Sequence, residues 1–105
     1  MKLPINNDII ASICRQEDIA YLGLFGSYAR GDAKDTSDVD ILVDFTTTKS
    51  FFQLSKVQQK LEGYFHKKVD LVLRTAIKEN IKPYIYHDLQ ILYEERWSDL
   101  YSRHS

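Results

Sequence analysis

The stretch from Gly26 to Val43 constrains the possible fold of this chain more than any other part. It reads GSYARG, then a loop of six residues, then DVDILV. A near-continuous apolar run at 19–25 precedes the Gly-Ser turn, which is typical of a strand buried on both faces. If residues 38–45 form a second strand, Asp38 and Asp40 point to the same side of it, about 6 to 7 Å apart. The short connection predicts an antiparallel pair, with the turn and both carboxylates at one end of a small sheet.

These residue types together favour binding of a nucleoside triphosphate. Two carboxylates this close repel each other unless a cation lies between them, and carboxylate oxygens are the usual ligands of Mg²⁺. The turn at Gly26 and Ser27 offers backbone N–H groups and a hydroxyl at the start of a short helix, with Ser27 as its expected N-cap. These groups would hold the terminal phosphates. Arg30 is equally consistent with a phosphate contact and with a tie that holds the loop.

A third carboxylate is expected at the same end of the sheet. Residues 69–73 read VDLVL, the pattern of a strand, and they follow a helical pattern. A strand–helix–strand passage is almost always a right-handed crossover between parallel strands, which places Asp70 level with Asp38 and Asp40. A buried Asp is costly without a cation or a hydrogen-bond partner, although Asp70 could instead pair with a neighbouring lysine.

One pattern in this chain consists of Gly26-Ser27, ten intervening residues, then Asp38-Val39-Asp40. It resembles the signature of the DNA polymerase β-type nucleotidyltransferase superfamily. The fuller string GSYARG…SDVDILV is similar to its smallest branch, the minimal nucleotidyltransferases. This motif covers eighteen residues, and the rest of the chain matches that branch in order and length. The resemblance implies an α/β (α+β) fold, with helices packed on a small mixed sheet of three to four strands. It also implies a single domain, 1–105.

The resemblance further implies two Mg²⁺ ions, with ATP as the substrate. In a two-metal site the ions lie about 3.5 to 4 Å apart and grip the attacking and leaving oxygens. Asp38 and Asp40 would bridge both ions. Asp70 would hold the ion nearest the nucleophile and could accept its proton.

Members of this branch typically lie beside a HEPN-domain ribonuclease toxin and act as its antitoxin. The resemblance therefore implies an enzyme that transfers AMP from ATP to a tyrosine of a partner HEPN toxin and so neutralises it. Because this chain ends almost at the catalytic core, the acceptor has to bring its own surface. Two alternatives stay open: a catalytically idle antitoxin that blocks the toxin by binding, and a small-molecule adenylyltransferase of the aminoglycoside type. Three convergent acids argue against the first, and the need for an acceptor pocket argues against the second.

Composition excludes several other classes. The 105 residues are 44% apolar and 28% charged, as in an ordinary soluble globular protein. A formal net charge of -1 carries no basic footprint, so no direct nucleic-acid partner is expected. No segment is apolar enough to span a membrane. The single Cys14 cannot form an internal disulfide, which fits a reducing cytoplasm. We expect Cys14 to pack as a small apolar residue on the first helix.

The remaining elements are predicted from caps and periodicity. A first helix begins at a cap among residues 6–8 and ends near 16–18, and Ser50 is a candidate cap for a helix at 51–63. Phe52 lies off the buried stripe of that second helix. The residues expected on the stripe are Phe51, Leu54, Val57 and Leu61.

The C-terminal part of the chain gives a weaker pattern. One helical turn is expected at 76–80, and Pro83 suits the first turn of a helix through about His87. Residues 89–93 are open between an edge strand and a continuation of that helix. The residues with helical spacing in the tail are Tyr93, Trp97, Leu100 and Tyr101. This stripe could pack against the sheet or contact a partner.

Overall fold

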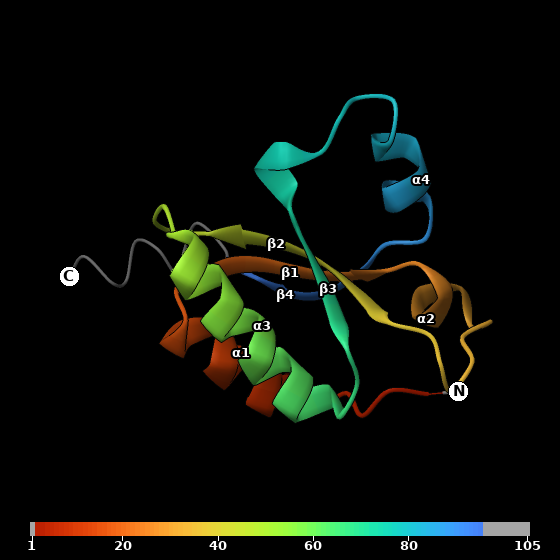
Figure 1. The fold of residues 1–105 in the computed structure, drawn as a ribbon, viewed down its shortest axis with the longest axis horizontal. Helices are drawn as coiled ribbons and strands as arrows, with labels where there is room; N and C mark the ends of the chain where they lie inside the picture. Colours follow the sequence, from red (N-terminus) through yellow and green to blue (C-terminus); the bar gives the residue numbers. More distant parts are fainter. Residues whose placement is uncertain (1, 96–105) are drawn as a thin grey trace.

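A mixed sheet of four strands lies at the centre of the molecule, for which a computed structural model describes residues 2–95 (Figure 1). Its strands follow one another across the sheet in the order β3-β2-β1-β4. The strand bounds are β1 (Ile19–Phe25), β2 (Val39–Phe45), β3 (Val69–Leu73) and β4 (Gln90–Glu94). The predicted α+β fold with a small mixed sheet is therefore confirmed.

The strand directions follow from the lengths of the connections. β1 and β2 are antiparallel, whereas β2 and β3 are parallel and joined by the helix α3 (Phe51–Phe65). β4 lies antiparallel to β1 at the other edge, so the segment that the sequence left undecided is an edge strand. β1 and β2 lie inside the sheet: β1 is apolar on both faces, which suits a strand covered from both sides, whereas β2 is apolar on one face and carries Asp40 and Asp44 on the other.

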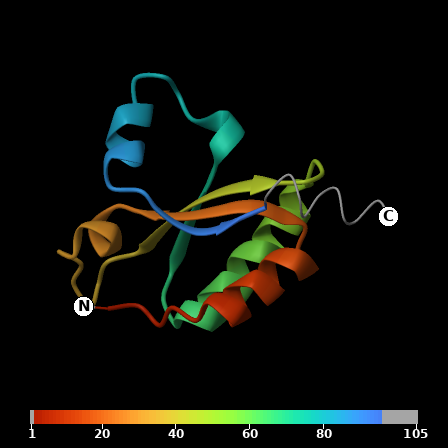
Figure 2. The ribbon, with the colours of Figure 1, turned by 180° about the vertical axis from the view of Figure 1, so that it is seen from behind.

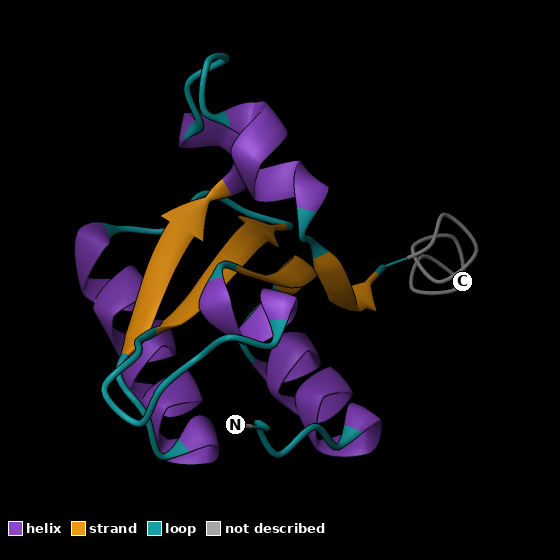
Figure 3. Cartoon of the chain, turned by 90° about the vertical axis from the view of Figure 1, so that its right-hand side faces the viewer, coloured by secondary structure: helices purple, strands orange, loops and turns teal. Residues whose placement is uncertain are grey.

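The two faces of the sheet carry different layers (Figures 2 and 3). α1 (Asn7–Gln16) and α3 cover one face and form the main core with the strands. α4 (Lys82–His87) lies over the other face, where Ile85 forms a second, smaller core with Tyr21 and Leu42. The short α2 (Ser27–Arg30) lies at one end of the sheet, directly after β1.

Side-chain caps fix the starts of both long helices. The Asn6 side chain accepts hydrogen bonds from the Asp8 and Ile9 N–H groups at 3.0 and 3.1 Å. Ser50 and Gln53 form a capping box at the start of α3, which confirms Ser50 as the cap. Cys14 is fully buried on α1, and burial raises the pKa of its thiol to about 12, which agrees with its prediction as an apolar residue.

The structure corrects the predicted buried stripe of α3. Phe51 is 85% exposed, and the fully buried positions are Val57, Leu61 and Phe65. At about 100° per residue Phe51 lies about 120° around the helix from Val57, at the margin of the buried face. Phe52 is 84% exposed, as predicted.

Two further expectations for the C-terminal part need correction. The helical turn expected at 76–80 is instead a 3₁₀ turn, η1 (Arg74–Ala76), that begins directly from β3. Ile77 then adopts an extended backbone and packs against the second core, which prevents a helix there. Tyr93 is half-buried in β4, whereas Trp97, Leu100 and Tyr101 lie outside the described residues. Within the described part of the chain, no helix has the length and apolar character needed to cross a membrane.

Leu42 tests the packing between α4 and the sheet. Leu42→Ala should lower the free energy of unfolding by about 2–5 kcal/mol, because a fully buried side chain leaves a cavity beneath Ile85. Ile91→Ala is the control: Ile91 is 57% exposed, and its loss should change stability by no more than about 0.5 kcal/mol. Denaturant unfolding of both variants measures the difference, and equal costs would contradict the packing of α4 on this face.

Candidate active site

The predicted acidic residues gather at the end of the sheet where β1 stops and β2 and β3 start. Asp40 is the register partner of Phe25 in β1 and of Asp70 in β3, and Asp38 immediately precedes β2. Successive side chains of a strand alternate between faces, so Asp40 shares the face of Leu42, which α4 covers. We call this side of the sheet the carboxylate face. The prediction that Asp70 lies level with the Asp-x-Asp pair is confirmed.

Gly26 holds the turn between β1 and α2 against the Asp40 carboxylate. Its φ of 75° and ψ of -152° lie in a region open almost only to glycine. A Cβ at this position would collide with Oδ2 of Asp40 and would lie 3.0 Å from its Cγ. Backbone and carboxylate therefore approach each other as closely as they do only because residue 26 has no side chain.

Ser27 occupies a different place in the turn from the one expected. Gly26 is the N-cap of α2 and Ser27 is its first residue, and no side-chain cap bond forms. The reason is the positive φ that the turn requires, which glycine supplies and serine does not. The carbonyl of Ser27 accepts hydrogen bonds from the N–H groups of Gly31 and Asp32, each at 3.0 Å, and these close the turn.

The three carboxylates interact electrostatically. Burial raises the pKa of Asp40, the neighbouring charges of Asp70 and Asp38 raise it further, and the guanidinium of Arg30 opposes them. Asp40 is half-buried, whereas Asp38 and Asp70 are exposed. The expectation that Asp70 is buried is thus wrong, since β3 is an edge strand and its residue 70 remains open to solvent.

A metal role for these carboxylates stays a prediction. Their oxygen donors and mutual repulsion suit a hard divalent cation. Among residues 2–95, however, no three His, Cys, Asp or Glu side chains are arranged in a group that could hold a metal ion.

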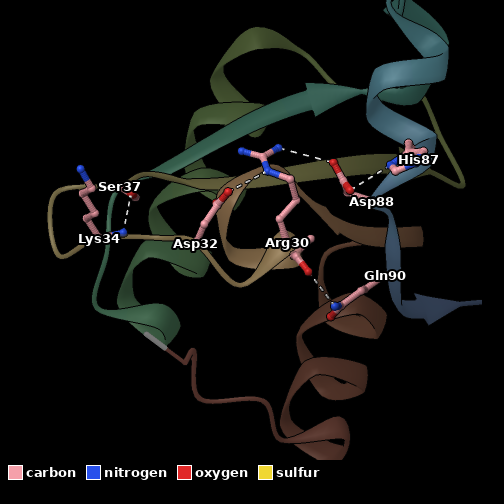
Figure 4. A network of polar contacts seen from close by, with 8 residues as sticks. Arg30, Asp32, Lys34, Ser37, His87, Asp88 and Gln90 are labelled. Carbon is pink, nitrogen blue, oxygen red and sulfur yellow. Dashed lines mark hydrogen bonds and ion pairs between the residues drawn. The ribbon is translucent and has the colours of Figure 1, made fainter.

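Arg30 belongs to a polar network that joins α2 to the end of α4 (Figure 4). Its Nε contacts Oδ2 of Asp32 at 3.3 Å, and its Nη1 contacts Oδ2 of Asp88 at 3.4 Å. The other Asp88 oxygen lies 3.1 Å from Nδ1 of His87. Gln90 adds a hydrogen bond from its Nε2 to the Ala29 carbonyl at 3.1 Å. The structure therefore shows the tie that was one of the two roles considered for Arg30.

Asp88 and Gln90 belong to this network beside the candidate site, and the sequence reasoning missed both. Asp88 lies 58 positions from Arg30, and no spacing motif in the chain links the two. The available signal was indirect: a polar pair around Leu89 at the end of a short helix, whose place depends on β4 being an edge strand.

The chain matches the family described as "Polymerase beta, Nucleotidyltransferase" over residues 7–97. It is 45% identical over 60 residues to the protein adenylyltransferase MntA of Thermococcus cleftensis, which covers 57% of this chain and 61% of that protein. The chain thus spans less than two thirds of the length of this relative.

Solved structures share the fold. A toxin–antitoxin complex with AMP-PNP superposes with a TM-score of 0.72 at 24% identity, over 92% of this chain and 80% of that one. A chain from the complex of the tri-AMPylated HEPN toxin of Shewanella oneidensis with an MNT antitoxin gives a TM-score of 0.63 at 22% identity, over 90% of this chain and 75% of that one. At these identities the likeness establishes the architecture.

The contact between Gly26 and Asp40 can be tested with a pair of glycine variants. Gly26→Ala and Gly31→Ala both place a side chain at a positive φ. The backbone cost is about 1–2 kcal/mol at Gly31, which is left-handed, and about 1–3 kcal/mol at Gly26, whose ψ of -152° lies outside that region. Only Gly26→Ala also meets a carboxylate, since no heavy atom lies within 4 Å of a Cβ at Gly31. We expect Gly26→Ala to lower the free energy of unfolding clearly more than Gly31→Ala.

A double variant identifies the source of that excess. Adding Asp40→Ala to Gly26→Ala should recover part of the lost stability, because the colliding carboxylate is gone. Chemical unfolding of the single and double variants provides the measurement. No recovery in the double variant would mean that backbone strain alone explains the cost.

Proposed function

This chain belongs to the polymerase β nucleotidyltransferase family, and from that membership we propose that it is an antitoxin that transfers AMP from ATP to a tyrosine of a partner HEPN ribonuclease toxin. Its relative MntA is a protein adenylyltransferase, which supports AMP as the transferred group. The toxin–antitoxin complexes that share the fold support the acceptor class, and one of them contains an AMPylated HEPN toxin.

The observation that carries the proposal is the packing of Asp40. Its carboxylate lies against the backbone of Gly26 and beside Asp70 in the register of the sheet. A turn able to bind phosphate and a set of carboxylates therefore occupy the same end of one face. A protein that only blocked its partner would have no need to hold repelling acids together beneath a glycine turn.

In the proposed reaction the turn binds the nucleotide. The hydroxyl of Ser27 and the backbone N–H groups after Gly26 would donate hydrogen bonds to the terminal phosphates. Arg30 lies three residues after Ser27, at the end of α2, and its positive charge acts to lower the pKa of Asp40. These groups would orient the triphosphate so that its α-phosphorus faces the acceptor oxygen.

The acids fit a divalent cation by their chemistry. Asp38, Asp40 and Asp70 are hard oxygen donors, and the last two are register partners. We propose that they hold two Mg²⁺ ions, which when bound would neutralise the charge on the phosphates. The burial and charge repulsion that raise the pKa of Asp40 are what a bound cation would offset.

The transfer itself is a displacement at phosphorus. The acceptor tyrosine oxygen forms a bond to the α-phosphorus, and the bond from that phosphorus to the oxygen bridging the α- and β-phosphates breaks, so that pyrophosphate leaves. The proton of the tyrosine hydroxyl has to go to a base, and Asp70, the exposed member of the acidic set on β3, would accept it. We also propose that residues 1–105 form a single catalytic domain that acts in the cytoplasm.

The proposed transfer is tested by mixing the protein with the neighbouring-gene HEPN protein, ATP and Mg²⁺ and measuring the intact mass of the acceptor. We expect a gain of one or more AMP units. Asp38→Asn or Asp40→Asn should remove most of it, because Asn keeps the shape but loses the charge. Asp44→Asn is a matched control, since Asp44 lies on the same strand near its opposite end, where its side chain accepts a hydrogen bond from the neighbouring Phe45 N–H.

The mass measurement separates the proposed function from its rivals. Near-normal transfer by the Asp40→Asn variant would contradict the carboxylate assignment. An unmodified toxin that is nevertheless inhibited would identify an idle antitoxin. Transfer to an aminoglycoside, with none to the toxin, would identify a small-molecule enzyme.

Ser27 tests the phosphate-binding role of the turn. Ser27→Ala should weaken ATP binding by roughly 1.5–3 kcal/mol, the loss of one hydrogen bond to a charged group, while the backbone amides still bind. The effect on transfer should therefore be smaller than that of the Asp variants. Calorimetric titration with ATP gives the affinity, and an unchanged affinity would exclude the hydroxyl from phosphate binding.

A further inference from the structure

Arg30 has two carboxylate partners that differ in how firmly they are held. Asp32 follows α2 on a loop, and its side chain is 63% exposed. Asp88 ends α4, and its side chain is 19% exposed. Because Asp88 is more shielded and belongs to an element packed on the sheet, it is the partner better able to hold a guanidinium in one direction.

Asp88 is itself oriented by its neighbours. Its Oδ1 lies 3.1 Å from Nδ1 of His87, and the pKa of Asp88 is lowered by that hydrogen bond first and by Arg30 next. Since an ionised carboxylate only accepts, the His87 Nδ1 carries the hydrogen. On the other side of Asp88, Leu89 packs into the core of the carboxylate face and Gln90 donates to the Ala29 carbonyl. The segment after α4 is therefore fixed to α2 at two points (Figure 4).

Asp88 holds the Arg30 guanidinium toward the carboxylate face of the sheet. α4 packs on the carboxylate face through Ile85, so its last residues lie on the same side of the sheet as Asp40. The Arg30 guanidinium has five N–H donors, and the two described ion pairs engage Nε and Nη1. Donors therefore remain for a ligand, and a guanidinium presents them in the planar arrangement that phosphate oxygens accept.

We propose that Asp88 is a positioning residue for the nucleotide: by holding Arg30 toward the carboxylate face, it presents the guanidinium to the phosphates of a nucleoside triphosphate. This role rests on the proposed function, because it requires ATP at the turn after Gly26. His87 acts one step further out, by fixing the orientation of the Asp88 carboxylate.

The sign of a charge effect makes the proposal testable. Asp88 is negative and ATP is strongly negative, so removal of the Asp88 charge alone should tighten ATP binding. If Asp88 acts by positioning Arg30, Asp88→Asn should weaken binding instead. The two explanations thus predict opposite changes in the same dissociation constant.

The experiment is a double-mutant cycle on the full chain, with the dissociation constant for ATP measured by calorimetry in the presence of Mg²⁺. Asp88→Asn should raise the dissociation constant roughly two- to five-fold, the range for a partly exposed ion pair. Arg30→Ala should raise it by roughly ten-fold or more, as expected for a lost charged contact. In the Arg30→Ala background, Asp88→Asn should then leave the dissociation constant unchanged or lower it, because only the effect of the removed charge remains.

Two control variants accompany the cycle. Asp35→Asn removes the same charge from the exposed loop after α2, where the described contact of residue 35 is made by its backbone carbonyl, and it should leave ATP binding unchanged or tighter. Asp88→Glu should retain most of the affinity, because it keeps the carboxylate. In transfer assays Asp88→Asn should raise KM for ATP and leave kcat nearly unchanged, which a general loss of stability would not do.

Each outcome decides one point. Equal or tighter ATP binding by Asp88→Asn overturns the positioning role, and so does a loss that persists in the Arg30→Ala background. If Asp88→Asn is unfolded by its melting temperature, His87→Ala replaces it and should weaken binding in the same direction. Failure of the unaltered protein to bind ATP or transfer AMP would overturn the proposed function itself. If the unaltered protein binds ATP and Asp88→Asn binds it equally well, only the positioning role of Asp88 is overturned.

Discussion

The close approach of the Gly26 backbone to the Asp40 carboxylate is the contact on which the rest of the site depends. It requires a residue without a side chain, in a backbone region that other residues avoid. It also requires the register that sets Phe25 opposite Asp40 in the sheet. The glycine of the turn and the aspartate of the next strand are therefore one structural requirement, although α2 and a loop separate them in the sequence.

This arrangement costs stability, because it places carboxylates that repel one another at one end of one face. The apolar core on the opposite face of the sheet offsets that cost. α1 and α3 bury a large apolar core on one face, to which β2 contributes Val39, Ile41 and Val43. The alternate residues of the same strand are then free to include Asp40 and Asp44 beside the smaller core of Leu42. A strand with one strongly apolar face can carry a half-buried carboxylate on the other without losing its place in the fold.

Most of the fold was predictable because it follows from local patterns. Apolar runs located β1, β2 and β3, and a crossover rule fixed the parallel pairing that sets Asp70 beside Asp40. The errors arose where tertiary packing decides. Phe51 has helical spacing but lies at the margin of the buried face, and the positive φ of Gly26 moves Ser27 out of the cap position. The metal-binding roles of the acids rest on chemistry and resemblance, since residues 2–95 show no ready metal group.

The Arg30–Asp88 pair could not be found from sequence, yet the topology makes such a contact understandable. β3 and β4 lie at opposite edges of the sheet, so the chain between them has to pass over one face. α1 and α3 already cover the other face, which leaves the carboxylate face for α4. Because β4 then pairs with β1 near its end, the residues that join α4 to β4 pass beside the turn that follows β1. A crossing required by strand order thus brings Asp88 to Arg30, and it fixes a segment far along the chain directly to the short helix that follows Gly26.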